Sequence, residues 1–173
     1  MAHLDLKLDN LMLDEDYNLK VIDFDLSYTK DHESIRGRGT ANYRAPELRF
    51  KNTQKRALDP KRCDIFSMGV ILFILKSGGV LPFKETEAGN PFFEDFSVSE
   101  KLFWMAHRRL KNRDMEFFSE EFMELFEGMC AKDPRKRLSI DDVLESEWAQ
   151  GDVYNGKELK EVMDKFFKNS KRE

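Results

Sequence analysis

Apolar and polar positions follow one pattern in the first third of the chain and another after it. Two short apolar runs, residues 11–13 and 19–22, flank a polar connection of five residues. Such spacing predicts a β-hairpin. Residues 27–44 are polar and charged and include two glycines, so we expect a long exposed loop there. Loops of that length inside a compact domain usually carry function.

The remainder of the chain predicts helices. Residues 62–76 are apolar on nearly every side, which is typical of a helix in the middle of a core, and Gly78-Gly79 should end it. Three further helix starts are predicted where a serine precedes acidic residues and an apolar periodic segment. These serines are Ser97, Ser119 and Ser139.

The last segment predicts an amphipathic helix, because its apolar residues recur at i, i+3, i+4, i+7 and i+8. They are Leu159, Val162, Met163, Phe166 and Phe167. Two interpretations stay open. The stripe either docks on the rest of the domain, or it belongs to a detachable helix that binds a regulatory partner.

Composition narrows the class of protein. The 173 residues are 40% hydrophobic, enough for one folded domain with a core, and 36% charged. The net charge of −4 argues against a nucleic-acid partner, because neutralising phosphates needs a basic face. The longest apolar run, residues 65–75, is too short to cross a membrane, and no signal peptide precedes it.

The cysteines point to a reducing compartment. Cys63 and Cys130 lie 67 positions apart, a spacing that suggests neither a disulfide framework nor a zinc site. We therefore expect two buried thiols in a cytoplasmic protein, with the nucleus as a second compartment.

Polar residues cluster around the predicted hairpin. Asn10 stands just before the first strand and Asp23 just after the second, so antiparallel pairing should bring them side by side. An amide oxygen and a carboxylate there suit Mg²⁺, which takes few protein ligands and keeps water or phosphate oxygens. Asp5, a candidate base, and Lys7, a candidate phosphate partner, lie on the same approach. This combination suggests phosphoryl transfer.

The residues around this cluster resemble the motifs of eukaryotic protein kinases. His3-Leu4-Asp5-Leu6-Lys7-Leu8-Asp9-Asn10 is similar to the catalytic loop H-R-D-L-K-x-x-N. Four more motifs follow in the family's order: D-F-G at 23–25, G-T with A-P-E at 39–47, the D-x-W-S-x-G-V helix at 64–70 and D-P-x-x-R at 133–137. Among protein kinases, these motifs most resemble those of serine/threonine kinases of the calcium/calmodulin-dependent type.

The resemblance implies a mainly α fold, the C-terminal lobe of a protein kinase. It would be a helical bundle with a short β-hairpin carrying the catalytic and metal-binding loops, without the N-terminal lobe. Residues 1–149 would be a partial catalytic domain, with its activation segment at about 23–47. Residues 150–173 would form the C-terminal amphipathic helix.

Catalytic roles are implied in the same way. Asp5 would accept or orient the substrate hydroxyl proton, and Lys7 would stabilise charge on the transferring phosphate. Asn10 and Asp23 would hold Mg²⁺ on ATP. Thr40 would hydrogen-bond near Asp5 and Lys7 and help to place the acceptor.

Four further residues have implied roles outside the chemistry itself. Glu47 and Arg137 would form a buried structural ion pair. Asp64 would tether the catalytic loop to the central helix. Tyr43 would line the peptide groove.

The chain departs from the family pattern at two motif positions. Leu4 replaces the arginine that normally receives an activation-loop phosphate, so we hypothesise that activity does not require phosphorylation of that loop. Asp25 replaces the glycine of D-F-G, and its Cβ should restrict the Asp23 loop.

The nucleotide-covering lobe and the helix that leads into the catalytic loop do not precede His3. We interpret Met1 as an internal methionine of a longer chain. A missing core helix should leave apolar surface uncovered.

Two functions follow. The first is an ATP-dependent serine/threonine kinase, here truncated, that transfers the γ-phosphate of Mg-ATP to a protein hydroxyl. The alternative is a catalytically inactive half-domain that acts as a scaffold or regulatory binding module.

Overall fold

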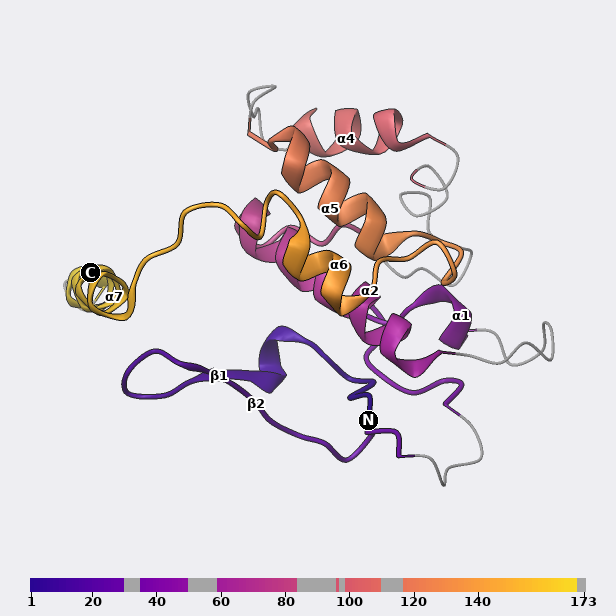
Figure 1. The fold of residues 1–173 in the computed structure, drawn as a ribbon, viewed down its shortest axis with the longest axis horizontal. Coiled ribbons are helices and arrows are strands. Elements are labelled where there is room, and N and C mark those ends of the chain that lie inside the picture. Colours follow the sequence, from indigo (N-terminus) through magenta and orange to yellow (C-terminus); the bar gives the residue numbers. More distant parts are fainter. Residues whose placement is uncertain (30–34, 50–58, 84–95, 97–98, 110–116, 171–173) are drawn as a thin grey trace.

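The chain folds into a group of helices with a two-stranded hairpin on one side (Figure 1). A computed structural model describes residues 1–29, 35–49, 59–83, 96, 99–109 and 117–170. The elements within them are η1 (Leu8–Asn10), β1 (Leu11–Leu13), β2 (Leu19–Val21), α1 (Pro46–Arg49), α2 (Pro60–Ser77), α4 (Glu100–Arg109), α5 (Glu120–Cys130), α6 (Ile140–Glu145) and α7 (Gly156–Ser170). The prediction of a mainly α fold with one short hairpin is confirmed.

The predicted hairpin is present, and its register places Asn10 opposite Ile22, one residue before Asp23. β1 and β2 pair antiparallel, with Leu11 opposite Val21 and Leu13 opposite Leu19. The turn between them is closed by Asp14, whose carboxylate accepts the backbone N–H groups of Asp16 at 3.0 Å and Asn18 at 2.8 Å. Asp14 therefore acts as a turn-forming residue.

The central helix α2 begins two residues earlier than predicted. Asp59 caps it by accepting the Lys61 N–H at 3.0 Å, and Pro60 occupies the first turn. It ends at Gly78, whose φ of 66° is left-handed. α5 lies close to α2 at Gly69, where a Cβ would stand 2.7 Å from the Cys130 Sγ. The small residue permits this close packing, and both cysteines are buried and free as predicted.

The core is rich in aromatic residues and surrounds Phe73 of α2. The Phe73 ring lies 5.7 Å from Phe103 of α4, 5.0 Å from Phe126 of α5 and 5.4 Å from Phe118, measured between centroids. Each of these four rings is at most 2% exposed. The aromatic side chains thus join α2, α4 and α5 into one core.

Two of the three predicted serine caps are confirmed. The Ser119 hydroxyl accepts the Phe122 N–H at the start of α5. Ser139 and Asp142 form a reciprocal capping box at the start of α6. Ser97 lies outside the described residues, and α4 begins at Glu100. In the part of the chain that the structure describes, no helix is both long enough and apolar enough to span a membrane.

Helix α7 lies to one side of the bundle and contacts the hairpin turn (Figure 1). Tyr17 Oη donates to Asp164 Oδ1 at 2.6 Å, and Lys160 Nζ lies 2.7 Å from Asp16 Oδ1. The Tyr17 ring stacks on Phe167 with centroids 6.1 Å apart. The predicted amphipathic helix therefore exists and is partly docked, but on the turn of the hairpin.

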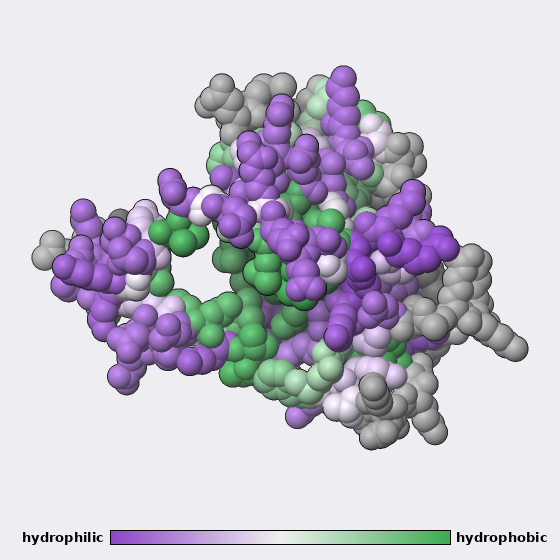
Figure 2. All heavy atoms as spheres, in the orientation of Figure 1, coloured by the Kyte–Doolittle hydropathy of each residue, from purple (hydrophilic) through white to green (hydrophobic). Residues whose placement is uncertain are grey.

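Several apolar side chains of the hairpin are exposed (Figure 2). Met12 is 51% exposed, Leu13 47% and Leu19 60%. Exposed apolar side chains therefore lie on both strands of the hairpin.

Candidate active site

The catalytic-loop segment is held by the first turns of α2. Asp64 accepts the backbone N–H of His3 at 2.6 Å and that of Leu4 at 2.8 Å. Burial raises the pKa of the Asp64 carboxyl, and these two hydrogen bonds partly offset that rise. The predicted tether between the central helix and the loop is confirmed.

His3 connects the loop to the end of β2. Its Nδ1 accepts the Asp5 N–H at 3.2 Å, which assigns the ring proton to Nε2, and Nε2 donates to the Ile22 carbonyl at 3.0 Å. The ring also lies 4.8 Å from that of Phe24. His3 therefore links the backbone at Asp5 to the backbone just before Asp23.

Asp5 is buried and surrounded by donors. Its Oδ1 accepts both the N–H and the hydroxyl of Thr40, each at 2.7 Å, and its Oδ2 lies 3.0 Å from Lys7 Nζ. Lys7 also donates to Thr40 Oγ1 at 3.3 Å. Burial would raise the pKa of Asp5, but the hydrogen bonds from Thr40 and Lys7 outweigh it and lower that pKa. The group is an ionised carboxylate in a defined orientation.

Asn10 completes this group from the start of the hairpin. Its side-chain Nδ2 donates to the Asp5 carbonyl at 2.9 Å, and its backbone carbonyl accepts the Ile22 N–H at 3.0 Å. Asp23 is the next residue along, exposed, with a left-handed φ of 63°. The structure thus brings Asn10 within hydrogen-bond distance of Asp5. Asp23 follows Ile22, the residue whose N–H is bound by Asn10.

This arrangement suits a Mg²⁺ that is bound together with a nucleotide. Among the described residues, no three His, Cys, Asp or Glu side chains gather into a site that could hold a metal by itself. Mg²⁺ usually takes one or two protein ligands and completes its shell with phosphate oxygens and water. The amide oxygen of Asn10 and the Asp23 carboxylate are the groups here that could serve as two such ligands.

The substitution at Asp25 is accommodated without strain. Left-handed backbone angles at non-glycine residues occur at Leu4, Tyr17 and Asp23 among the residues described, and Asp25 does not share them. Its side chain is exposed. The conformation in this structure therefore does not use the freedom that a glycine would offer.

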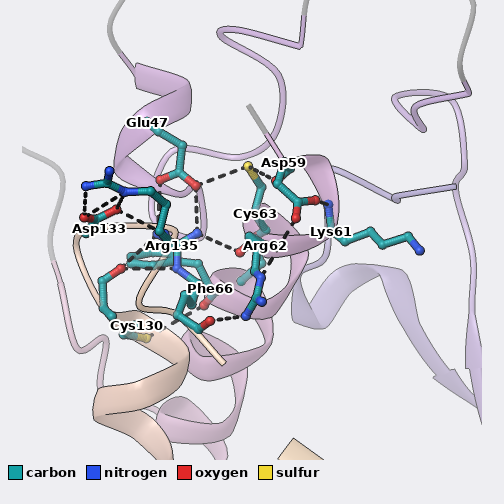
Figure 3. A network of polar contacts seen from close by, with 12 residues as sticks. Glu47, Asp59, Lys61, Arg62, Cys63, Phe66, Cys130, Asp133 and Arg135 are labelled. Atoms are coloured by element: carbon teal, nitrogen blue, oxygen red, sulfur yellow. Dashed lines mark hydrogen bonds and ion pairs between the residues drawn. The ribbon is translucent and has the colours of Figure 1, made fainter. Parts of the chain in front are cut away.

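Glu47 and Arg137 form the predicted buried ion pair. Figure 3 shows Glu47 within this network, close to Cys63. Arg137 Nη1 lies 2.7 Å from Glu47 Oε1 and its Nη2 lies 3.1 Å from Oε2. Arg137 is 2% exposed and also donates to the carbonyls of Arg62 and Ala131. The Cys63 thiol donates to Glu47 at 3.3 Å, a contact that sequence reasoning missed. The network joins α1 to α2 and to the loop after α5.

Sequence reasoning also missed the contacts of two arginines, Arg38 and Arg44. Arg38 donates to the Leu26 carbonyl at 3.2 Å, and Arg44 donates to the Gly39 carbonyl. Charged side chains in a polar loop are usually solvated, so no pattern marks these two. Tyr43 is half-buried, and its predicted place in a peptide groove stays a prediction.

The site thus consists of a buried acid held by a threonine and a lysine, with an asparagine and an aspartate at the open end of the hairpin. A sequence profile of the protein kinase domain matches residues 1–149. The chain belongs to the protein kinase family.

Its relatives are named as kinases. CBL-interacting protein kinase 26 of Oryza sativa subsp. japonica is 36% identical over 96% of this chain and 32% of its own length. The ovarian-specific serine/threonine-protein kinase Lok of Drosophila melanogaster is 38% identical over 86% of this chain and 30% of its own length. The chain therefore spans about a third of the length of these relatives.

Proposed function

We propose that this chain supplies the catalytic lobe of a protein serine/threonine kinase, which transfers the γ-phosphate of Mg-ATP to a Ser or Thr hydroxyl of a protein. The observation that carries this proposal is the hydrogen-bonded group of Asp5, Lys7 and Thr40, with Asn10 bonded to the Asp5 carbonyl. A lobe used only as a scaffold has no need of an oriented, ionised acid at this place.

Each residue has a distinct part in the proposed reaction. Asp5, which its lowered pKa keeps ionised at neutral pH, orients the acceptor hydroxyl and receives its proton. Lys7 stabilises negative charge on the transferring phosphoryl group. Asn10 and Asp23 hold Mg²⁺, whose charge offsets that of the nucleotide phosphates when it is bound. Thr40 keeps Asp5 in one orientation.

A second candidate function rests on a different observation. The apolar hairpin face and the apolar residues of α7, with Val162 42% exposed and Phe166 64%, form surface that another polypeptide can cover. A non-catalytic scaffold, or a regulatory partner that binds α7, would use that surface. The oriented Asp5 favours the kinase.

Nucleotide binding provides the first test. Millimolar Mg-ATP should raise the unfolding temperature of the full chain by about 2–5 °C, because a ligand bound only to the folded state stabilises it. Asp23→Asn should abolish this shift, and Asp9→Asn, an exposed neighbour with no assigned ligand role, should retain it. An unchanged unfolding temperature in the parent chain would favour the scaffold.

Phosphoryl transfer is tested with a Ser/Thr peptide library and labelled ATP. Asp5→Asn should abolish transfer and preserve the Mg-ATP shift, since the substitution removes the base and no proposed metal ligand. Transfer by the Asp5→Asn variant at the parent rate would show that another group accepts the proton.

A further inference from the structure

A tight turn in the activation segment brings Arg44 back onto Gly39. The Tyr43 N–H donates to the Thr40 carbonyl at 3.0 Å, which closes the turn. Arg44 Nε then donates to the Gly39 carbonyl at 3.1 Å, and its Nη2 donates to the same oxygen. One guanidinium therefore binds one backbone carbonyl with two of its N–H groups.

The Gly39 carbonyl and the Thr40 N–H belong to a single peptide group, which is planar and rigid. Arg44 binds the carbonyl oxygen at one edge of this planar group. At the opposite edge, the Thr40 N–H donates to Asp5 Oδ1 at 2.7 Å. Because the plane cannot twist internally, the position of the oxygen determines where the N–H points.

The other neighbour of this peptide is the backbone just before Asp5. Gly39 has a φ of 86°, and a Cβ there would stand 2.5 Å from the Leu4 carbonyl oxygen. The glycine is thus required both by its backbone angle and by the close approach of Leu4. The peptide is packed against the catalytic loop as well as bonded to it.

We propose that Arg44 is a positioning residue for Asp5, because it holds the Gly39–Thr40 peptide so that the Thr40 N–H points at the Asp5 carboxylate. The positive charge of the Arg44 guanidinium beside the carbonyl oxygen also polarises the peptide and strengthens its N–H as a donor. The geometric part stands on the contacts alone. Its catalytic meaning rests on the proposed kinase function.

The Thr40 backbone amide reports on this arrangement directly. In NMR spectra of the full chain, Arg44→Gln should speed hydrogen exchange of the Thr40 amide about tenfold and move its proton resonance upfield, because the N–H loses its alignment with Asp5. Arg44→Lys keeps one charged donor and should give an intermediate change. Arg135→Gln removes an exposed guanidinium bound to Asp133 and should leave Thr40 unchanged.

A purely structural role would appear differently. The unfolding temperature and the amides of α5 should be the same in Arg44→Lys as in the parent, so a change confined to Thr40 supports positioning. Gly39→Ala serves as a positive control, since its Cβ displaces the same peptide. A Thr40 amide that responds to Gly39→Ala but not to Arg44→Gln would overturn the proposal.

Measurements of phosphoryl transfer distinguish a failure of this proposal from a failure of the proposed kinase function. If the parent transfers phosphate, Arg44→Lys should lower kcat with little change in the KM for nucleotide, because Asn10 and Asp23 are untouched. An unchanged kcat would overturn the catalytic meaning. If the parent transfers none, the kinase assignment fails and the Thr40 amide alone decides the positioning role.

Discussion

Leu4, Tyr17 and Asp23 have left-handed φ angles of 65°, 63° and 63°, although each carries a side chain that opposes them. Strained backbone persists where its surroundings enforce it. The N–H of Leu4 is bound by Asp64, and the hydroxyl of Tyr17 by Asp164. Two of the three strained residues flank the candidate site, and no sequence pattern indicates this conformation.

Arg137 and Arg135 are a matched pair two positions apart. Arg137→Met should lower the free energy of unfolding by about 3–5 kcal/mol, because it leaves the enclosed Glu47 carboxylate without its partner. Arg135→Met removes only an exposed contact with Asp133 and should change stability little. Urea denaturation of both variants measures the difference, and equal losses would contradict the buried ion pair.

His107 should make stability depend on pH. The ring is buried between Phe73 and Phe103, and burial lowers its pKa from 6.5 to about 4. Below pH 6.5 the unfolded chain binds a proton that the folded chain refuses, so stability falls with pH until about 4 and then levels. The loss is about 2 kcal/mol between pH 6.5 and 5.

The control is His107→Phe, which keeps an aromatic ring in the core and cannot titrate. Denaturation curves at pH 7, 6 and 5 should show a flatter dependence in this variant. A dependence as steep as that of the parent would assign the effect to other groups.

At the scale of elements, local signals and long-range docking differ in how well sequence reveals them. The Ser139–Asp142 capping box lies within four residues and was predicted from the sequence. The docking of α7 joins Tyr17 to Asp164 across 147 positions. The apolar stripe of α7 predicts a helix. It does not predict where that helix docks, because many surfaces can cover the same apolar residues.

Tyr17→Phe should loosen α7 from the hairpin. The variant keeps the ring stacked on Phe167 and loses only the hydrogen bond to Asp164. We expect faster hydrogen exchange in both α7 and the hairpin turn, measured by mass spectrometry, and a further increase at high salt as the Lys160–Asp16 pair is screened. Tyr154→Phe, on an exposed residue, is the control, and equal exchange in both variants would contradict this docking.

At the scale of the whole molecule, an aromatic core lies beside a hairpin with exposed apolar side chains. The helices bury Phe73 completely, while Leu19 is 60% exposed. Exposed apolar patches on folded proteins promote association. The candidate site lies at the border between these two regions.

The uncovered hairpin should make the isolated chain self-associate. Sedimentation velocity should show a larger species as concentration rises, and Leu19→Lys should reduce it by placing a charge on the hairpin. Val153→Lys puts the same charge on a residue that is 84% exposed elsewhere and should have little effect. Association that is insensitive to Leu19→Lys would place the contact on another surface.

The sequence by itself determined several of the elements and which polar residues meet around Asp5. The hairpin, α2 and the caps of α5 and α6 follow from residue types at short spacing, and the contacts among Asp5, Lys7, Asn10 and Thr40 follow from the spacing of the family motifs. Family motifs preserve that spacing, so the Glu47–Arg137 pair and the Asp64 tether could also be predicted.

Only the tertiary structure decided what depends on exact orientation between distant segments. The two hydrogen bonds from Arg44 to the Gly39 carbonyl, the Cys63 thiol on Glu47 and the docking of α7 on the hairpin turn are of this kind. Each joins groups that have several alternative partners in the unfolded chain. Packing of the whole molecule selects one partner for each group, and no local sequence pattern predicts which partner that is.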